Sequence, residues 1–374
     1  MKIAIKPLDL LFFRNAKPFN ASHSAFGETL DKPHTTTLYG ALRSKILLDN
    51  SELYSEFLQE NAAEVTEVIG SPSNKGSLKI KFFSVLSPED KPLLPMPKDL
   101  VTEKDKGEDI FPLKLIKKPD WISYDSNYPF NYMLVTEKDI KVEKPANPFI
   151  NLPELERYLN LEEKLNIKNN EENYFIKEFR TGIKINRKTN RVEEGMLYRK
   201  ELLNLKDGFS YLMELSGHDG LLPEEGILKL GGESKAAFYK SRNISSSIKL
   251  NKTVKKKIKE SKKFKIYLAT PAVFNKGWLP ESVDDNLIIS LDNGIRIKII
   301  CCSTDKHKMI SGWDIDKKKP RPGYRMIPAG SIYHCEVLND SFEIKELLSA
   351  LHGKSISDYN KKDGFGIAYI GGIK

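Results

Sequence analysis

Cysteine is scarce in this 374-residue chain, and the three present do not form a metal-binding pattern. Cys301 and Cys302 are adjacent in the apolar run RIKIICCS, Cys335 stands apart, and no CxxC pair occurs. The spacing argues against a structural zinc site and against a disulfide framework. Strand alternation would direct Cys301 and Cys302 to opposite faces. We therefore expect buried free thiols in a reducing compartment, and no metal or cofactor.

Long apolar runs and the common catalytic motifs are also missing. No run reaches the 18 or so apolar residues that a transmembrane helix needs, and the start MKIAIKPLD does not have the pattern of a signal peptide. We therefore expect a cytoplasmic protein without a membrane partner. The motifs GxSxG, HExxH and GxxxxGK[ST] are absent.

Positive charge is present in excess. The chain has 60 Lys and Arg against 51 Asp and Glu, a net charge of +9, which favours polyanionic partners such as nucleic acid. The densest stretch is 235–265, with twelve cations and the single acid Glu260. It fits either a solvated helix face or a linker. We place a domain boundary inside it, which gives expected domains over 1–248 and 249–374.

The hydrophobic pattern predicts an α+β protein. Leu38, Leu42 and Ile46 define one helical face, and a second helix is expected in FEIKELLSALHG. Thr36 or Thr37 is expected to cap the first helix. We expect an irregular surface segment over 85–120 and a helix or turn in 221–240 that breaks at Gly231-Gly232. The strands are expected in KIAIKP, FSYLMELS, KFKIYL, RIKIICCS and GSIYHCEVL.

Two basic segments have a composition suited to nucleic acid. The sequence FRTGIKINRKTNRVEEGMLYRKELL predicts a hairpin whose tip exposes Arg187, Lys188 and Arg191, which can lie along a nucleic-acid backbone. The alternative is an ordinary solvated turn. The segment FFRNAKPF interleaves aromatic rings with cations and is typical of surfaces that stack bases, although at least one phenylalanine can instead end a core strand.

Two histidines were weighed for catalysis. His218 belongs to the tripeptide HDG, one pair of the kind found in metal phosphohydrolases, but its neighbours Gly217 and Gly220 favour a turn. His23 lies in a basic loop, where it can act as a general acid or base or merely contact phosphate.

The C-terminal sequence GFGIAYIGG raises a choice between a phosphate loop and a tight turn. A dinucleotide fingerprint requires a helix after its glycines, and no helix can follow Gly372 here. We expect a turn that closes the second domain before a final strand. The backbone N–H groups of Gly364, Phe365 and Gly366 are expected to lie near an RNA phosphate.

Several motifs in order resemble one family, the third subunit of the Cmr complex, in the RAMP superfamily. They are PLDLLFFRNAKPF, TTTLYGALR, EEGMLYRKELL, LKLGGES, ATPAVFNKGWLP, SGWD, RMIPAGSIYHCE and GFGIAYIGG. The resemblance implies two tandem ferredoxin-like (RRM-like) domains with inserted loops, a thumb-like hairpin and a C-terminal glycine-rich loop.

The resemblance also implies a function. The chain would be a non-catalytic, RNA-binding scaffold subunit of a type III-B CRISPR effector, active in antiviral defence. It would cap the 5′ tag of the guide RNA and contact the large polymerase/cyclase-like subunit, the neighbouring RAMP backbone subunit and other Cmr subunits. The residues that would bind the tag, beside the hairpin tip, are Arg14, Lys17, Ser22, His23, Tyr39, Gly40, Arg43, Gly364, Phe365 and Gly366.

Two other functions fit parts of the pattern. Some RAMP relatives are metal-independent endoribonucleases that process precursor CRISPR RNA with a loop histidine, for which His23 is the candidate. A protein-interaction module without RNA contact is the third alternative. Nothing in the resemblance assigns a role to the basic run 249–265.

Overall fold

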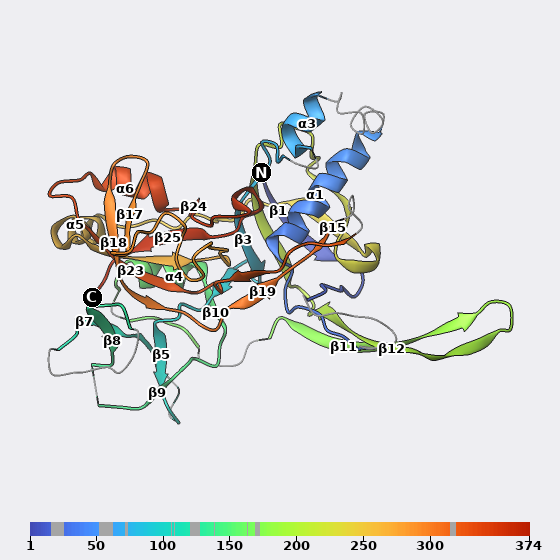
Figure 1. Cartoon of the computed structure of the whole chain (residues 1–374), viewed down its shortest axis with the longest axis horizontal. Helices are drawn as coiled ribbons and strands as arrows, with labels where there is room; N and C mark the ends of the chain where they lie inside the picture. The colour runs from blue at the N-terminus through green and yellow to red at the C-terminus, as the bar shows by residue number, and fades with distance from the viewer. Residues whose placement is uncertain are drawn as a thin grey trace. The chain divides into compact units, whose positions relative to one another are not determined.

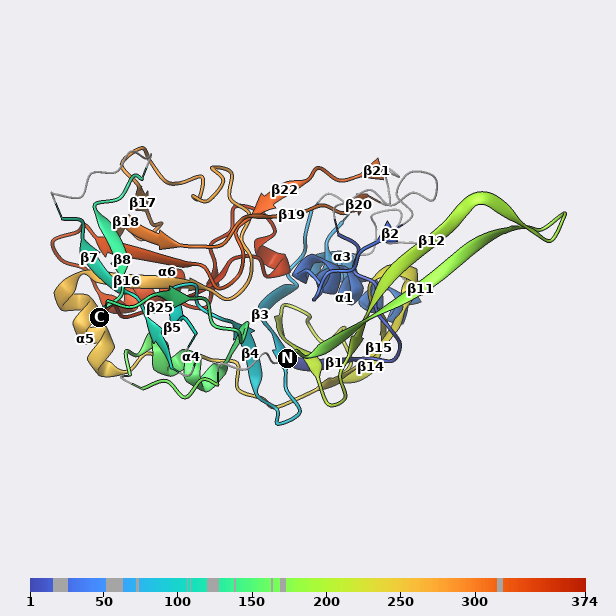
Figure 2. The ribbon, with the colours of Figure 1, turned by 90° about the horizontal axis from the view of Figure 1, so that it is seen from below.

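In the computed structural model, the chain forms two compact units built from interleaved segments (Figures 1 and 2). The structure describes residues 1–15, 26–51, 63–71, 74–105, 107, 109–119, 128–137, 139–162, 164–168, 173–314 and 319–374. Unit 1 comprises Met1–Asp90, Asn173–Ile244 and Met309–Tyr324. Unit 2 comprises Lys91–Glu172, Ser245–Lys308 and Arg325–Lys374.

Unit 1 contains an antiparallel sheet in the order β3-β13-β1-β15-β14. The central strand alternates as the sequence predicts, with Ile3 and Ile5 fully buried. Helix α1 packs against β3, β14 and α3. The strands are β1 (Lys2–Pro7), β3 (Lys79–Leu86), β13 (Ser210–Ser216), β14 (Glu225–Lys229) and β15 (Ala236–Ser241), and the helices are α1 (Thr35–Asp49) and α3 (Ala63–Ile69).

Helix α1 confirms the predicted periodicity, because Leu38, Leu42 and Ile46 are all fully buried. The predicted threonine cap is wrong. The helix begins at Thr35, and its N-cap is His34, whose side chain makes no capping hydrogen bond. Thr35 itself is buried, so burial of the first turn, rather than a cap, fixes the start of the helix.

The remaining elements of unit 1 are a long hairpin and several short pieces. The hairpin consists of β11 (Phe175–Asn186) and β12 (Arg191–Leu205), and β2 (Phe26–Gly27) pairs with it. A short 3-10 turn, η2, covers Gly232–Ser234. The pair β20 (Trp313–Asp314) and β21 (Lys319–Pro320) lies in the segment 309–324, whose ends fall within β19 (Lys308–Ile310) and β22 (Tyr324–Met326).

Unit 2 contains a second antiparallel sheet, in the order β17-β18-β23-β16-β25-β24. Helix α5 packs against β16, and α6 packs against β24 and β25. The strands are β16 (Lys263–Leu268), β17 (Ile288–Ser290), β18 (Arg296–Ser303), β23 (Ile332–Val337), β24 (Lys354–Ser355) and β25 (Ile367–Gly371). The helices are α5 (Lys252–Ser261), α6 (Ile344–Leu351) and the 3-10 turn η3 (Lys361–Asp363).

The central strands of the two units have the same order and the same antiparallel pairing. In chain order, unit 1 uses β1, β3, β13 and β15, and unit 2 uses β16, β18, β23 and β25. In both sheets the second strand pairs with the third, the third with the first, and the first with the fourth. Figure 1 shows α1 between the first and second strands of unit 1, and α6 between the third and fourth of unit 2.

The segment 91–172 forms a set of short elements that belong to unit 2. Its prolines keep the strands short, since proline cannot donate to a ladder. The expected irregular surface segment over 85–120 is therefore wrong in part. The elements are β4 (Pro92–Pro95), β5 (Leu100–Glu103), β6 (Ile110–Pro112), β7 (Lys114–Lys117), β8 (Tyr132–Val135), β9 (Val142–Glu143), β10 (Phe149–Asn151) and α4 (Leu152–Leu159).

A buried polar cluster joins this segment to the sheet of unit 2. The Asp99 carboxylate accepts a hydrogen bond from the Tyr158 hydroxyl and lies 3.7 Å from Lys265 Nζ and 3.9 Å from His334 Nε2. All four side chains are at most 3% exposed. The Lys265 ammonium also lies 3.5 Å from the centre of the Tyr158 ring. Removing Asp99 would leave a buried cation without its counter-charge, which is strongly destabilising.

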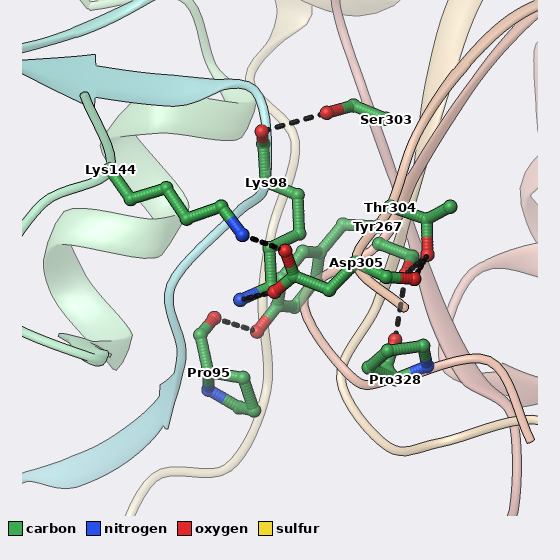
Figure 3. Close-up of polar contacts among 9 residues, drawn as sticks. Pro95, Lys98, Lys144, Tyr267, Ser303, Thr304, Asp305 and Pro328 are labelled. Carbon is green, nitrogen blue, oxygen red and sulfur yellow. Dashed lines mark hydrogen bonds and ion pairs between the residues drawn. The ribbon is translucent and has the colours of Figure 1, made fainter. Parts of the chain in front are cut away.

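A second tie lies a few residues away (Figure 3). The Asp305 carboxylate receives Lys98 Nζ at 2.8 Å and also bonds Lys144, so it joins two points of the segment 91–172 to the end of β18. Partial burial opposes ionisation of Asp305, but the two ammonium groups hold its pKa below the usual value. The Ser303 hydroxyl donates to Lys98 O and the Tyr267 hydroxyl to Pro95 O.

These ties explain how the two units differ from the expected domains. The change of unit at Ser245 lies near the expected boundary at 249, but the segment 91–172 lies with the second half of the chain rather than the first. The partners of Asp99 and Asp305 are lysines and a histidine far away in sequence, so the sequence pattern gave no sign of this association.

Other predictions have clear outcomes. The helix at 344–351, the hairpin at 175–205 and the five predicted strands are confirmed. The expected helix or turn in 221–240 is wrong for most of its length, because β14 and β15 flank the turn at Gly231 and Gly232. The basic run forms the exposed face of helix α5, and the His218 segment is a turn, closed by Leu221 N to His218 O at 2.9 Å.

The cysteines are free, as predicted. Cys301 and Cys335 are buried and Cys302 is half-buried, and burial raises the pKa of each thiol. Cys301 is opposite His334 and Cys302 opposite Tyr333 in the pairing of β18 with β23, which confirms that the two point to opposite faces. Within the described ranges, no helix is long and apolar enough to cross a membrane.

We predict that His334 makes the stability of the protein depend on pH. Burial lowers its pKa to about 4, against about 6.5 in the unfolded chain. Between these values the unfolded state binds a proton that the folded state does not, so the free energy of unfolding falls as the pH falls. Going from pH 7 to pH 5 should cost about 2 kcal/mol through this group.

The measurement is chemical denaturation of the wild type and of His334→Gln at pH 7 and pH 5. The glutamine does not titrate, so the variant should lose about 2 kcal/mol less than the wild type over this interval. The lowered pKa values of His218 and His352 affect both proteins alike. An equal loss in both proteins would contradict the assignment.

Candidate RNA-binding surface

The most prominent surface feature of unit 1 is the hairpin of β11 and β12, which extends away from the rest of that unit (Figure 2). Its arms of 12 and 15 residues span roughly 40 Å at the usual rise of a strand. The hairpin carries eight Lys or Arg against four Glu over 175–205. It therefore places a net positive charge along a narrow, accessible arm.

The pairing register gives the hairpin an exposed apolar face. Residues directly opposite each other share a face, and Ile183 pairs with Leu197 while Ile185 pairs with Val192. With Phe179 they form what we call the apolar face. Each of these five side chains is 45 to 58% exposed, although all are large and hydrophobic. Isolated exposed hydrophobics are ordinary, but a contiguous set on one face indicates a binding surface.

An aromatic and cationic stack lies at the root of the apolar face. The Phe26 and Phe179 ring centroids are 6.1 Å apart, and the Arg199 guanidinium lies 4.1 Å from the centre of the Phe179 ring. Phe26 reaches this place because β2 pairs in parallel with β12 at Arg199 and Lys200. The two rings are 42 and 50% exposed. Exposed rings beside a guanidinium are a platform on which nucleobases stack.

The tip carries unpaired cations. Arg187, Lys188 and Arg191 are exposed, and none of them forms an ion pair with a residue that the structure describes. The turn between the strands is held by Asn186, whose side-chain oxygen accepts from Lys188 N at 2.9 Å. Asn190 takes a left-handed φ of 51°, which asparagine tolerates. The basic tip is thus presented on a defined turn.

Ion pairs fix the root of the hairpin to the rest of unit 1. Lys177 bonds Asp31 at 2.9 Å and lies 3.4 Å from Glu201, and Lys200 bonds Glu233. Partial burial alone would lower the pKa of Lys177, but these carboxylates raise it above its usual value. The Lys177, Lys200 and Glu201 side chains are therefore occupied in the fold.

Three motifs that are distant in sequence meet at this root. Leu11 forms a bridge with Leu203, Phe12 O accepts from Gly232 N at 2.8 Å, and Lys235 bonds Asp9 at 2.5 Å. The bonds to Asp9 from Lys235 and from Leu10 N hold the pKa of this carboxyl below its usual value. Phe12 and Phe13 are both buried, so the aromatics of FFRNAKPF belong to the core.

The N-terminal candidates divide into placed and unplaced residues. Arg14 is exposed and its backbone bridges Thr29. Lys17, Ser22 and His23 lie outside the described residues, so their predicted role stays a prediction.

The candidates on α1 are less accessible than the sequence suggested. Tyr39 is 2% exposed, and its hydroxyl donates to Leu78 O at 3.3 Å. The Arg43 guanidinium donates to Ser71 O at 3.1 Å and to Gly70 O at 3.4 Å. Both side chains hold α1 to neighbouring segments. Gly40 is exposed, with open space where a side chain would begin.

The glycine-rich loop in unit 2 is a turn and not a phosphate cradle. Gly366 N donates to Pro271 O at 2.7 Å, Phe365 N to Asn360 O at 3.3 Å and Gly364 N to Lys361 O at 3.2 Å. All three residues are buried, and Phe365 is only 1% exposed. Because every N–H group in question already has a backbone partner, the expected backbone contact with phosphate is wrong for this conformation.

Cavities and metal ligands do not coincide with these residues. Unit 2 has an open pocket of about 340 Å³ lined by 129–132, 285–287, 298–300 and Glu336, and none of the predicted RNA-binding residues lines it. Within the part of the chain that the structure describes, no three His, Cys, Asp or Glu side chains gather to hold a metal ion.

Comparison with known proteins identifies the family. A family model described as CRISPR-associated protein (Cas_Cmr3) matches residues 3–373, which is nearly the whole chain. The chain belongs to the Cas_Cmr3 family. The resemblance inferred from the motifs is thereby confirmed. A search of curated proteins found no match.

Two solved structures are similar to this member of the Cas_Cmr3 family. One is a chain of the type III-B Cmr-beta complex bound to cognate target RNA and AMPPnP, in state 1. It has a TM-score of 0.51 at 17% identity, covering 89% of this chain and 86% of that chain. A chain of Cmr-beta bound to cognate target RNA matches with a TM-score of 0.50, the same identity and the same coverage. At this identity the likeness shows the fold, which confirms the mixed α+β class.

Sequence reasoning found the hairpin and its basic tip but missed the stack of Phe26, Phe179 and Arg199. The alternation of Phe179, Ile183 and Ile185 was a usable signal of a shared face. The approach of Phe26 depends on pairing between segments more than 150 residues apart, which no local pattern reveals.

We predict that Gly366→Ala destabilises the protein through a steric clash added to backbone strain. Gly366 has a φ of +66°, and a Cβ there would lie 2.6 Å from Ser357 N. The left-handed conformation alone costs a non-glycine residue roughly 1–2 kcal/mol. Gly277→Ala is the matched control, since Gly277 has a φ of +76° with nothing within 4 Å of the added carbon.

Thermal unfolding of both variants measures the difference. Gly277→Ala should lower the unfolding midpoint by a few degrees, and Gly366→Ala by clearly more. Equal midpoints would show that the loop has room and is not the closed turn described above.

Proposed function

We propose that this chain is a non-catalytic, RNA-binding subunit of a type III-B CRISPR effector complex. In that role it caps the 5′ tag of the guide RNA and docks to the large polymerase/cyclase-like subunit and to neighbouring RAMP subunits. Membership of the Cas_Cmr3 family and the RNA-bound Cmr-beta complexes among its structural neighbours support this assignment. The single observation that carries it is the hairpin, with free cations at its tip and an uncovered apolar face.

The strand orders support a ferredoxin-like assignment for both units. A βαββαβ unit of this class is an antiparallel sheet whose two outer strands flank the first and third strands. Both sheets have this order. In unit 1 the hairpin continues directly into the third strand, β13, so the insertion is the extended connection between the second and third strands. The tandem arrangement is therefore part of the proposal.

The hairpin combines two ways of holding RNA. Arg187, Lys188 and Arg191 are matched to phosphates, which attract cations without regard to sequence. Phe179 with Arg199 and Phe26 is matched to the flat face of an exposed base, because stacking suits any base. The apolar face between them fits a partner surface that excludes water. The arm would thus lie along RNA where bases and backbone are both accessible.

We predict that the tip and the stack affect RNA binding in different ways. The variant Arg187→Gln/Lys188→Gln/Arg191→Gln should lower affinity and also lower its salt dependence, by about 2 in the slope of log K against log [salt] for a single strand. Phe179→Ala should lower affinity by roughly tenfold through lost stacking and leave the slope unchanged.

Fluorescence anisotropy with a labelled guide RNA over a salt series makes this measurement. A control of equal charge change in unit 1 is Lys6→Gln/Lys206→Gln/Lys229→Gln, because these three lysines are exposed and lie outside the hairpin. The control should bind within twofold of the wild type. If the control lost as much affinity and slope as the tip variant, general charge rather than the hairpin would account for binding.

Recognition of the tag makes a further prediction. Guide RNA with its 5′ tag should bind more tightly than the same RNA without the tag, and the large subunit should increase that preference. Equal affinity for both RNAs would contradict tag capping. In the same preparations, repeat RNA incubated without metal should remain intact. Cleavage that His23→Ala abolishes would instead establish the endoribonuclease.

A further inference from the structure

Helix α5 presents a lysine face that the proposed function does not use. Only Val254 and Ile258 of this helix are buried, and they form one stripe. Lys252, Lys256 and Lys259 recur at i, i+4 and i+7 on the opposite side, and all three are exposed. Over 252–263 there are seven lysines against one acid, Glu260. We call Lys252, Lys256 and Lys259 the lysine face.

This arrangement opposes the stability of the helix. The first turn of α5 contains no acidic residue, although the positive end of the helix dipole favours one, and Lys252 stands there instead. Lys252 and Lys256 are like charges at i, i+4, as are Lys255 and Lys259, and such pairs destabilise a helix. The Asn251 side chain caps the helix by accepting from Val254 N at 2.8 Å. The lysines are therefore not explained by helix formation.

The carboxylates near the lysine face leave it mostly uncompensated. Among the described residues, Lys256 is 3.7 Å from Glu260 and Lys259 is 3.0 Å from Glu343, and Lys252 has no ion-pair partner. All four paired side chains are more than half exposed. Ion pairs of this kind contribute little and exchange readily for another anion.

We propose that the lysine face of α5 binds the phosphate backbone of a nucleic acid without sequence preference. Its three ammonium groups follow about 10 Å of helix, a length that corresponds to roughly three phosphates of one strand. Lysine acts as a point charge on phosphate and needs no bidentate geometry, so contact along a mobile backbone suits it. This site is separate from the hairpin and goes beyond the tag binding proposed above.

The composition of the face favours nucleic acid over an acidic protein. The exposed residues of α5 are lysines with Thr253, Glu260 and Ser261, and none is aromatic, arginine or a large aliphatic. Protein interfaces are enriched in aromatics and arginine and depleted in lysine, because binding energy concentrates on side chains that bury apolar area. Backbone binding to nucleic acid needs only dense positive charge.

The test uses the full-length protein and a labelled single-stranded RNA of mixed sequence without a tag. The variant Lys252→Gln/Lys256→Gln/Lys259→Gln should lower the slope of log K against log [salt] by about 2. Its affinity at 100 mM salt should fall about fivefold or more. The matched control is Lys117→Gln/Lys306→Gln/Lys354→Gln, since these are exposed lysines of the same unit outside α5. It should stay within twofold of the wild type.

Further arms decide the remaining outcomes. The unfolding midpoint of the α5 variant should equal or exceed that of the wild type, because a repulsion is removed. If it falls instead, Lys252→Arg/Lys256→Arg/Lys259→Arg keeps the charge and must retain the wild-type slope. A glutamine variant that binds like its control would overturn the proposal. So would polyglutamate that displaces RNA at equal charge concentration, which would indicate an acidic protein partner.

Discussion

A hairpin of two strands has no second layer, and this constraint governs the reading of the whole surface of unit 1. Beyond its root, β11–β12 cannot bury its own apolar side chains, so Phe179, Ile183 and Leu197 stay in water unless another molecule covers them. An isolated hairpin is also only marginally stable. The ion pairs of Lys177 and Lys200 at the root provide the support that keeps such an arm in a defined direction.

The two units handle buried charge in contrasting ways. At the hairpin root, the carboxylates of Asp9, Asp31 and Glu233 remain half exposed, so their pairs with lysine add little stability individually but fix geometry. In unit 2, Asp99 and Lys265 are almost fully buried, and their mutual attraction offsets a large desolvation cost. Burial lowers the pKa of Lys265 to about 8, although Asp99 opposes that shift. The association of segment 91–172 with the sheet depends on this match.

Local patterns predicted what local interactions determine. The helices at 35–49 and 344–351, the apolar strands and the hairpin follow from residue periodicity and turn chemistry. The short strands over 92–151 were missed because proline and charge interrupt the alternation, while pairing with other segments still orders them. The placement of 91–172 was missed because the partners of Asp99 and Asp305 come from β16, β18 and β23.

The candidate site shows the same division. The basic tip was predicted from NRKTNR alone, but the stack on Phe179 required the strand register and the parallel approach of Phe26. The glycine-rich loop shows the reverse error. Its composition fits a phosphate cradle, yet the carbonyls of Pro271, Asn360 and Lys361 already accept its N–H groups. Composition indicates which backbone conformations are possible, and tertiary contacts decide which groups stay available.

The central claim is that RNA covers the arm in the assembled complex. The most direct measurement is photo-crosslinking from a benzophenone amino acid placed at Ile183, in the middle of the apolar face, after assembly with guide RNA and partner subunits. The account predicts a crosslink to RNA that maps near the 5′ tag. Crosslinks to protein alone, with none to RNA, would contradict it and make the arm a docking element for another subunit.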